Sequence, residues 1–300
     1  MSAQKKAYRT VHEWLQQKPK SPLLVVLGPT ASGKTELSIE FARHFDGEII
    51  NADSRQIYRE VELGTAKPTA AELRQVPHHL ISEFSPERTV TVAEYRKLAE
   101  ECIRDILKRG KLPILSGSHT LLISAIVENY RFPGKVNKKR RDELLEIYAE
   151  LGGPQKLWCE LRKLNPKTAE RIPAENQHHL IRALERTGSG IKPQKDQRKF
   201  DCKLLGLNVP REKLYEKINA RVDEMMRSGL LAEVEHLAKK YDRHSPALRG
   251  HGYRELLDYL NGEKDLERAV EEIKKDTRNY AKRQMTWFRN SAFAKEIIWI

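Results

Sequence analysis

The residues best suited to chemistry form one short run, Gly28-Pro29-Thr30-Ala31-Ser32-Gly33-Lys34-Thr35, which matches the pattern Gly-x-x-x-x-Gly-Lys-[Ser/Thr]. Glycines let a loop wrap closely around phosphate, and the N-terminus of a following helix offers free N–H groups. Lys34 supplies a point charge, and the hydroxyl of Thr35 suits Mg²⁺. The run predicts a phosphate-binding loop of the kind found in nucleotide-binding and ATP-binding proteins, without specifying a reaction.

A second candidate group is the carboxylate of Asp53, in the run Asn51-Ala52-Asp53. It follows the short apolar run Glu48-Ile49-Ile50, just past the carboxyl end of a predicted strand. Ligands of open α/β sheets collect at that edge, where the phosphate-binding loop also lies. Taken alone, an aspartate here fits a helix N-cap or a water-mediated Mg²⁺ ligand better than a catalytic base.

Strands and helices alternate along the part of the chain that must position these groups. A continuous apolar run over 23–27 precedes the loop, and Leu37, Phe41 and Phe45 follow at helical spacing. Further strand-like runs occupy 112–115 and 203–207, and long amphipathic helices are expected over 214–226, 230–239 and 266–288. The pattern predicts an α/β fold: a P-loop NTPase-like core with a parallel sheet flanked by helices.

The chain divides by composition into segments. We expect a basic N-terminal extension over 1–22, with apolar residues at roughly helical spacing, and the first part of the α/β core over 23–134. Short helical pieces rich in Lys, Arg, Glu, Asn and His, broken by Gly and Pro, predict an inserted all-helical domain over 135–198. Core completion and C-terminal helices are expected over 199–300.

The overall charge favours a polyanionic partner. The 300 residues carry a formal net charge of +13 and a pI of about 9.5, which gives long-range attraction for nucleic acid. The three cysteines, Cys102, Cys159 and Cys202, are too few and too far apart for a disulfide framework, which fits a reducing cytoplasm. No apolar run approaches the ~20 residues of a membrane-spanning helix, so we expect a soluble protein with no membrane partner.

Three further runs resemble the signature set of the tRNA dimethylallyltransferases, also called the tRNA isopentenyltransferase or IPP transferase family. They are Asn51-Ala52-Asp53-Ser54-Arg55-Gln56-Ile57-Tyr58, Gly64-Thr65-Ala66-Lys67-Pro68 and Val76-Pro77-His78-His79-Leu80. The runs Gly252-Tyr253-Arg254-Glu255 and 277–289 are similar to that family as well. The resemblance spans nearly the whole chain in the expected order.

The resemblance implies transfer of a dimethylallyl group from dimethylallyl diphosphate to the exocyclic N6 of the adenosine 3′ of the anticodon. Asp53 is then the base that takes the amine proton, and Lys34, Mg²⁺ at Thr35 and the loop N–H groups meet the charge of the departing diphosphate. Arg249, a further catalytic candidate, matches an arginine in the family's tRNA-contacting segment, with a solvated basic face as the plain alternative. Thr30 and Thr65 are weaker candidates for contacts with the diphosphate. Family members are usually monomers.

The resemblance also implies that the helical insertion grips the tRNA anticodon arm. The candidate tRNA contacts are Asp53, Ser54, Arg55, Gln56, His119, His178, His179, Arg182, Arg249, Tyr253 and Arg254. Lys138, Lys139, Arg140 and Arg141 are expected to follow phosphates, although a solvated basic face is the plain alternative for each.

Two segments depart from the family pattern. The chain reads Gly117-Ser118-His119-Thr120-Leu121-Leu122 where members usually carry Gly-Gly-Thr-Gly-Leu-Tyr. His119 thus stands where the family's threonine approaches the flipped adenosine. The run Glu175-Asn176-Gln177-His178-His179 likewise replaces Asn-Asp followed by basic residues.

Two alternatives share these features. An ATP-dependent P-loop kinase has the same loop and sheet, but it gives no reason for the run from Asp53 to Gln56 or for the basic insertion. A divergent or inactive tRNA-binding homologue would explain the charge and the altered loop, but not the intact Lys34, Thr35 and Asp53.

Overall fold

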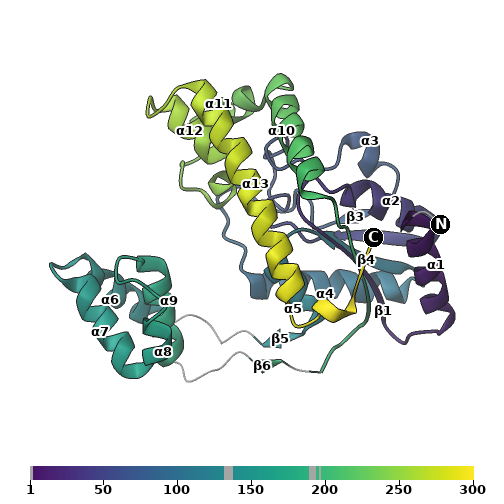
Figure 1. Cartoon of the computed structure of the whole chain (residues 1–300), viewed down its shortest axis with the longest axis horizontal. Coiled ribbons are helices and arrows are strands. Elements are labelled where there is room, and N and C mark those ends of the chain that lie inside the picture. The colour runs from purple at the N-terminus through teal and green to yellow at the C-terminus, as the bar shows by residue number, and fades with distance from the viewer. Residues whose placement is uncertain (1–2, 132–137, 189–193, 196) are drawn as a thin grey trace. The chain divides into compact units, whose positions relative to one another are not determined.

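The computed structural model describes residues 3–131, 138–188, 194–195 and 197–300, which form two compact units (Figure 1). The first combines the chain up to Asn129 with Gln197–Ile300, and the second is Tyr130–Asp196. Residues 1–2, 132–137, 189–193 and 196, which belong to the predicted extension, core and insertion, lie outside the described residues. No helix within the described ranges is long and apolar enough to cross a membrane.

A six-stranded sheet in the order β3-β2-β4-β1-β7-β8 forms the centre of the first unit, and its strands pair in parallel. Its strands are β1 Pro22–Leu27, β2 Gly47–Asn51, β3 His78–His79, β4 Leu112–Gly117, β7 Asp201–Gly206 and β8 Ile297–Trp299. The predicted α/β fold with a parallel sheet is confirmed. The sequence did not predict the edge strands β3 and β8, because two or three residues are too few to show a hydrophobic period.

Helices cover both faces of this sheet. The described helices of the first unit are α1 Ala3–Gln16, α2 Lys34–His44, α3 Ala70–Leu73, α4 Val92–Lys108, α5 Thr120–Val127, α10 Arg211–Arg227, α11 Leu230–Lys240, α12 Tyr253–Leu260 and α13 Leu266–Asn290, with short 3-10 helices η1 Pro246–Arg249 and η2 Ala294–Glu296. The three long C-terminal helices predicted from the sequence correspond to α10, α11 and α13.

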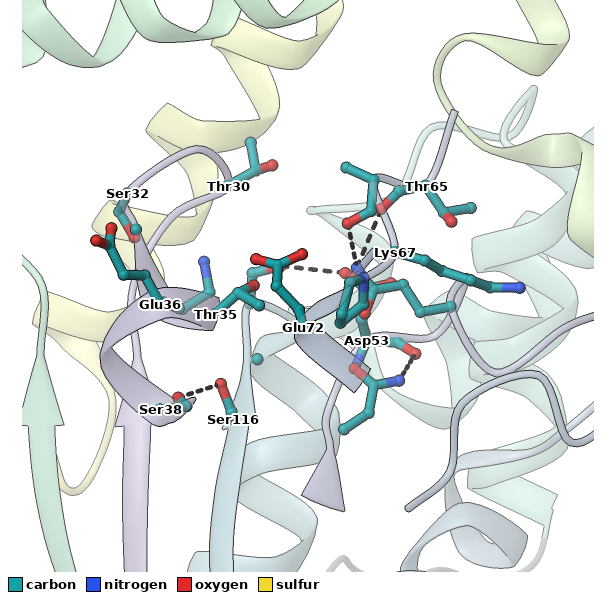
Figure 2. Close-up of a pocket in the computed structure, with 18 of the residues that line it drawn as sticks. Thr30, Ser32, Thr35, Glu36, Ser38, Asp53, Thr65, Lys67, Glu72 and Ser116 are labelled. Atoms are coloured by element: carbon teal, nitrogen blue, oxygen red, sulfur yellow. Dashed lines mark hydrogen bonds between the residues drawn. The ribbon is translucent and has the colours of Figure 1, made fainter. Parts of the chain in front are cut away.

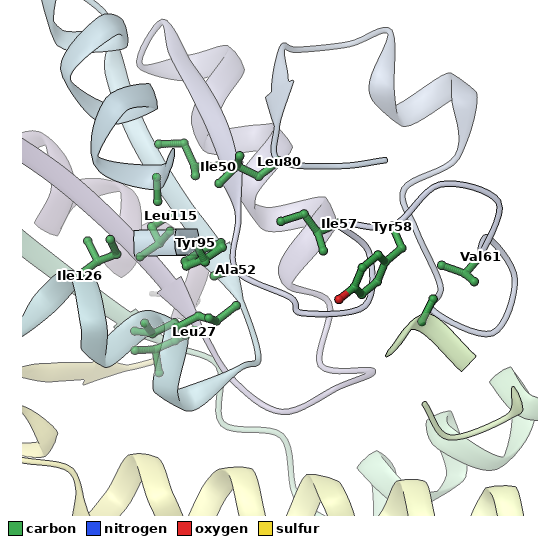
Figure 3. Packing of buried hydrophobic residues seen from close by; sticks show 14 of the residues in the cluster. Leu27, Ile50, Ala52, Ile57, Tyr58, Val61, Leu80, Tyr95, Leu115 and Ile126 are labelled. Atoms are coloured by element: carbon green, nitrogen blue, oxygen red, sulfur yellow. The ribbon is translucent and has the colours of Figure 1, made fainter. Parts of the chain in front are cut away.

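The continuous apolar run of β1 is explained by burial on both faces of the sheet. Successive strand residues point to opposite faces, so Leu24 and Val26 pack with α1 and α2, whereas Val25 and Leu27 pack with α4 and α5. Figure 3 shows Leu27 among the buried residues around Tyr95 of α4. The end of β1, which leads into the phosphate-binding loop, is therefore held between two apolar layers.

The N-terminal segment is part of this core. Its helix α1 buries Ala7, Val11 and Trp14 against the face that carries α2, and the ring of Tyr8 lies 4.7 Å from that of Phe41. The helical spacing seen in the basic extension thus corresponds to a packed helix that supports α2.

The second unit has a core of its own. It consists of α6 Lys138–Ala149, α7 Gly153–Leu164, α8 Pro166–Ala169 and α9 Gln177–Gly188, with the antiparallel pair β5 Tyr130–Arg131 and β6 Gln194–Lys195. Leu144, Leu157, Leu161 and Leu180 are fully buried inside it. A separate apolar core lets the unit keep its structure as an insertion in the first unit.

A buried carboxylate ties β2 to the end of α4. Glu48 accepts hydrogen bonds from the guanidinium of Arg109 and from Nε2 of His79 at 2.8 Å, and its side chain is 3% exposed. Hydrogen bonds from Arg109 lower the pKa of Glu48 to about 2, against burial, which raises it.

We expect Glu48→Gln to lower the free energy of unfolding at neutral pH by about 2 kcal/mol, because the charge-assisted bonds to Arg109 are lost. The folded pKa lies below the ordinary value of 4.5, so the advantage of the wild type is present above that pH and shrinks as the pH falls toward 2. Urea unfolding across this range measures the difference, with the exposed Glu87→Gln as the control. A constant difference down to the lowest pH would contradict the assignment.

Candidate active site

The phosphate-binding loop lies between β1 and α2, as the sequence predicted. Gly33 precedes α2 with a φ of +92°, a conformation that favours glycine, and Ala31 also has a positive φ of 60°. This tight turn leaves the first N–H groups of α2 free of helical partners. The loop can therefore surround an anion with backbone donors.

The ammonium of Lys34 folds back over this loop. Its Nζ donates to the carbonyl oxygen of Pro29 at 2.6 Å. Burial and, to a smaller extent, the charge of Arg221 lower the pKa of Lys34 to about 7, and the carboxylate of Asp53 opposes them. The lysine thus lies in a place where its charge needs an anionic partner.

Asp53 lies past the end of β2, at the same edge of the sheet. Its carboxylate accepts from the backbone N–H of Arg55 at 2.8 Å and from the hydroxyl of Ser118 at 3.3 Å. Asn51 exchanges hydrogen bonds with the backbone of Asp53 at 3.2 Å, and Tyr95 donates to the carbonyl of Asn51 at 2.9 Å. The carboxylate caps a turn and also faces the site. A role as a cap is therefore compatible with a role as a catalytic base.

Two adjoining hollows meet at Asp53. The first, of about 440 Å³, is lined by residues 30–36 of the loop and by Thr65, Glu72, Ser116, Lys217 and Arg221 among others. Figure 2 shows Thr30, Ser32 and Glu36 on one side of it and Asp53, Thr65 and Lys67 on the other. The second, of about 300 Å³, is lined by Ser54, Arg55, His119, Arg249, His251 and Tyr280 among others. Asp53 lines both, so one carboxylate faces the contents of each hollow.

Arg221 of α10 also lines both hollows, and sequence reasoning missed it. Its guanidinium donates to the carbonyl of Ala66 at 3.3 Å, and burial lowers its pKa, while Asp53 raises it. A signal was present: Leu214, Ile218 and Arg221 follow one another at helical spacing, which places a charge on the apolar face of the predicted helix. Such a charge indicates a functional position or a buried ion pair.

Gln284 of α13 was missed as well. Its amide accepts from the backbone N–H of Thr30 at 3.0 Å and donates to the carbonyl of Ser118 at 3.0 Å. One buried side chain therefore joins the phosphate-binding loop to the loop after β4. Because both partners are backbone groups far away in the chain, no local pattern could have shown this.

The predicted residues after Asp53 lie at the two hollows. Ser54 and Arg55 line the second, and the guanidinium of Arg55 bonds the carbonyl of Pro246. The amide of Gln56 donates to the carbonyls of Thr65 and Ala66 at 3.1 Å, which fixes one wall of the first hollow. The hydroxyl of Thr65 donates to the carbonyl of Val61 at 2.8 Å.

The predicted residues around η1 and α12 differ in accessibility. Arg249 is exposed, lines the second hollow and donates to the carbonyl of His244 at 2.8 Å. Tyr253 is fully buried, and its hydroxyl donates to Glu233 at 2.6 Å, so it supports the wall of the hollow through packing. Arg254 is exposed and paired with Glu255 and Asp276.

The candidates in the second unit lie on α6 and at the start of α9. His178, His179 and Arg182 are exposed, and Arg182 lies 3.2 Å from Glu185. Arg140 pairs with Glu160 at 2.9 Å, Arg141 lies 3.8 Å from Glu185, and Lys139 is exposed. The side chain of Lys138 lies outside the described part of the structure. Nearby glutamates therefore neutralise part of the positive charge of these basic residues.

Comparison with known proteins identifies the family. Residues 56–291 match the family model described as IPP transferase. The chain is 43% identical to a tRNA dimethylallyltransferase of Acetivibrio thermocellus, over 93% of this chain and 91% of the relative. It is 40% identical to a tRNA dimethylallyltransferase of Bacillus cytotoxicus, over 92% and 90%.

Solved structures agree. A tRNA isopentenylpyrophosphate transferase from Bacillus halodurans is 37% identical, with a TM-score of 0.70 over 93% of this chain and 89% of that one. A eukaryotic dimethylallyltransferase acting on tRNA is 27% identical, with a TM-score of 0.78 over 93% and 73%. With the family model matching most of its length and relatives above 40% identity, the chain belongs to the IPP transferase family.

Proposed function

We propose that this protein transfers the dimethylallyl group of dimethylallyl diphosphate to N6 of the adenosine 3′ of the anticodon in tRNA. The observation that carries the proposal is the position of Asp53, whose carboxylate lies where a phosphate-binding hollow meets a second hollow. Membership of the IPP transferase family supports the substrate pair.

The first hollow suits the diphosphate. Its oxygens would be met by the loop N–H groups, by the ammonium of Lys34 and by the guanidinium of Arg221. As the bond between the allylic carbon and oxygen breaks, the electron pair leaves with the diphosphate, and fixed positive groups stabilise that developing charge. Thr30 and Thr65 line the same hollow and are secondary candidates for contacts with it.

The oxygen groups in the first hollow also fit Mg²⁺. The hydroxyl of Thr35 and the carboxylates of Glu36 and Asp53 line it, and hard oxygen ligands together with phosphate oxygens are the donor set that Mg²⁺ prefers. Thr35 is the proposed protein ligand. When bound, the ion would neutralise charge on the diphosphate.

The second hollow suits the adenine. The rings of Tyr280 and His251 lie 5.6 Å apart there and offer aromatic surface for an unstacked base. The exocyclic amine is a weak nucleophile because its lone pair is delocalised into the ring, so its proton must leave as the C–N bond forms. Asp53 would receive that proton.

Contacts to the rest of the anticodon arm are assigned by charge and exposure. Ser54, Arg55, Gln56 and Arg249 line the two hollows in the first unit, and the exposed Arg254 follows Tyr253, which lines the second. His178, His179, Arg182 and the basic residues of α6 are the proposed phosphate contacts of the second unit. We propose a monomer in the cytoplasm: one unit holds both hollows, and all three cysteines are free thiols.

We expect Asp53→Asn to lower kcat for prenyl transfer about 1,000-fold, because the isosteric amide cannot take the proton. The measurement is transfer of radiolabelled dimethylallyl groups to unmodified tRNA. Tyr253→Phe, which keeps the ring in place, is the comparison for changes in the supporting wall. Transfer at the wild-type rate by Asp53→Asn would remove Asp53 as the base.

The same assay tests the function itself. No transfer by the wild type, despite tRNA binding, would leave a tRNA-binding homologue. Transfer of the γ-phosphoryl group of ATP to a small acceptor, with ADP formed, would indicate a kinase instead.

Diphosphate binding should take up a proton. The pKa of Lys34 is lowered to about 7, so the lysine is mostly neutral near pH 8.5, and an anion beside it restores the charged form. Isothermal titration with inorganic diphosphate in buffers of different ionisation enthalpy should show uptake near pH 8.5 that fades near pH 6. Lys34→Met, which keeps the length of the side chain, is the control: its proton uptake reports the protons that the diphosphate itself gains on binding. Equal uptake by both proteins would contradict the prediction.

Arg221→Gln should raise the KM for dimethylallyl diphosphate about 10-fold or more and leave the KM for tRNA nearly unchanged, because a charge-assisted contact to the donor is lost. Arg227→Gln, at the exposed end of the same helix, is the matched control. A selective rise in the KM for tRNA would move Arg221 to the acceptor side.

A further inference from the structure

His119 is held beside Asp53 by two backbone contacts. Its N–H donates to the carbonyl of Ala52 at 3.2 Å, which places it next to the residue that precedes Asp53. Its Nδ1 accepts from the backbone N–H of Leu122 at 3.3 Å and so caps α5. The ring lines the second hollow, which Asp53 also lines. The imidazole therefore has a fixed position close to the carboxylate.

The cap also determines which ring nitrogen carries the proton. Because Nδ1 accepts a backbone N–H, the neutral ring is protonated on Nε2, an assignment that follows from the hydrogen-bond pattern. Nε2 makes no hydrogen bond to another described residue. It is also not a buried atom without a partner, so it is available to a ligand in the hollow. Burial lowers the pKa of His119 and Arg55 lowers it further, while Asp53 raises it, so the net effect favours the neutral form.

Asp53 and His119 thus present an acceptor and a donor to the same hollow. Adenine offers the complementary pair, since its N6 amine donates and the ring nitrogens on either side of it, N1 and N7, accept. A threonine hydroxyl, as in the usual family run, can donate or accept. A neutral histidine whose Nδ1 is occupied can only donate.

We propose that Nε2–H of His119 donates to the ring nitrogen beside the amine of the target adenine, and so makes His119 a specificity-determining contact for that base. The inference rests on the proposed function, because it takes the second hollow as the base site. A base with a carbonyl in place of the amine would bring an oxygen against the carboxylate of Asp53 and lose the matching pair.

The test uses anticodon stem-loops that carry adenosine, 1-deazaadenosine, 7-deazaadenosine or 3-deazaadenosine at the target position. In the wild type, one deaza base, the one that lacks the contacted nitrogen (N1 or N7), should show a kcat/KM about 10-fold lower than the other two deaza bases. In His119→Asn, whose side-chain oxygen keeps the cap on Leu122 but whose amide does not reach as far, the same loss should appear with adenosine itself. In this variant, the deaza base that lacks the contacted nitrogen should show no further loss of kcat/KM relative to adenosine.

The double comparison separates the contact from changes in amine reactivity, which affect both proteins equally. His119→Gln, whose amide N–H reaches farther but caps poorly, should recover part of the deaza sensitivity.

Equal deaza effects in the wild type and in the variant would overturn the proposal while the transfer reaction stands. Absence of transfer to any stem-loop by the wild type would instead overturn the proposed function.

Discussion

The close approach of β4 to the end of β2 is the constraint on which the site depends. A Cβ at Gly117 would lie 2.2 Å from the carbonyl oxygen of Ala52, so this position accepts glycine alone. The contact lets the loop after β4 cross directly over the end of β2, with the N–H of Ala52 donating to Ser116 at 2.7 Å. It brings Ser118 and His119 to Asp53, and any side chain at Gly117 would separate them.

The C-terminal third then closes the site over this edge. Gln284 of α13 bonds the phosphate-binding loop and the loop after β4 at once, and Arg221 of α10 reaches both hollows. Helices far from the loop in the chain therefore determine its geometry as much as β1 and α2 do. These later helices place the phosphate-binding loop beside two adjoining hollows.

Electrostatics in the site favours an anion. Burial lowers the pKa of both Lys34 and Arg221, the charge of Arg221 also lowers the pKa of Lys34, and the carboxylate of Asp53 raises both. Two buried cations are costly without a counter-charge, and an anion in the first hollow would offset that cost. The same carboxylate faces the second hollow, so one group of charges borders both hollows.

By itself the sequence determined the loop from Gly28 to Thr35, the buried strands, the long C-terminal helices and the position of Asp53, because each leaves a local mark in spacing or hydrophobic period. It also predicted the family, from motifs spread along the chain. Only the tertiary structure showed that Arg221 lines both hollows, that Gln284 joins the two loops, that Tyr253 is buried, and that His119 lines the second hollow. Those facts depend on contacts between segments far apart in sequence, and such contacts are decided by packing.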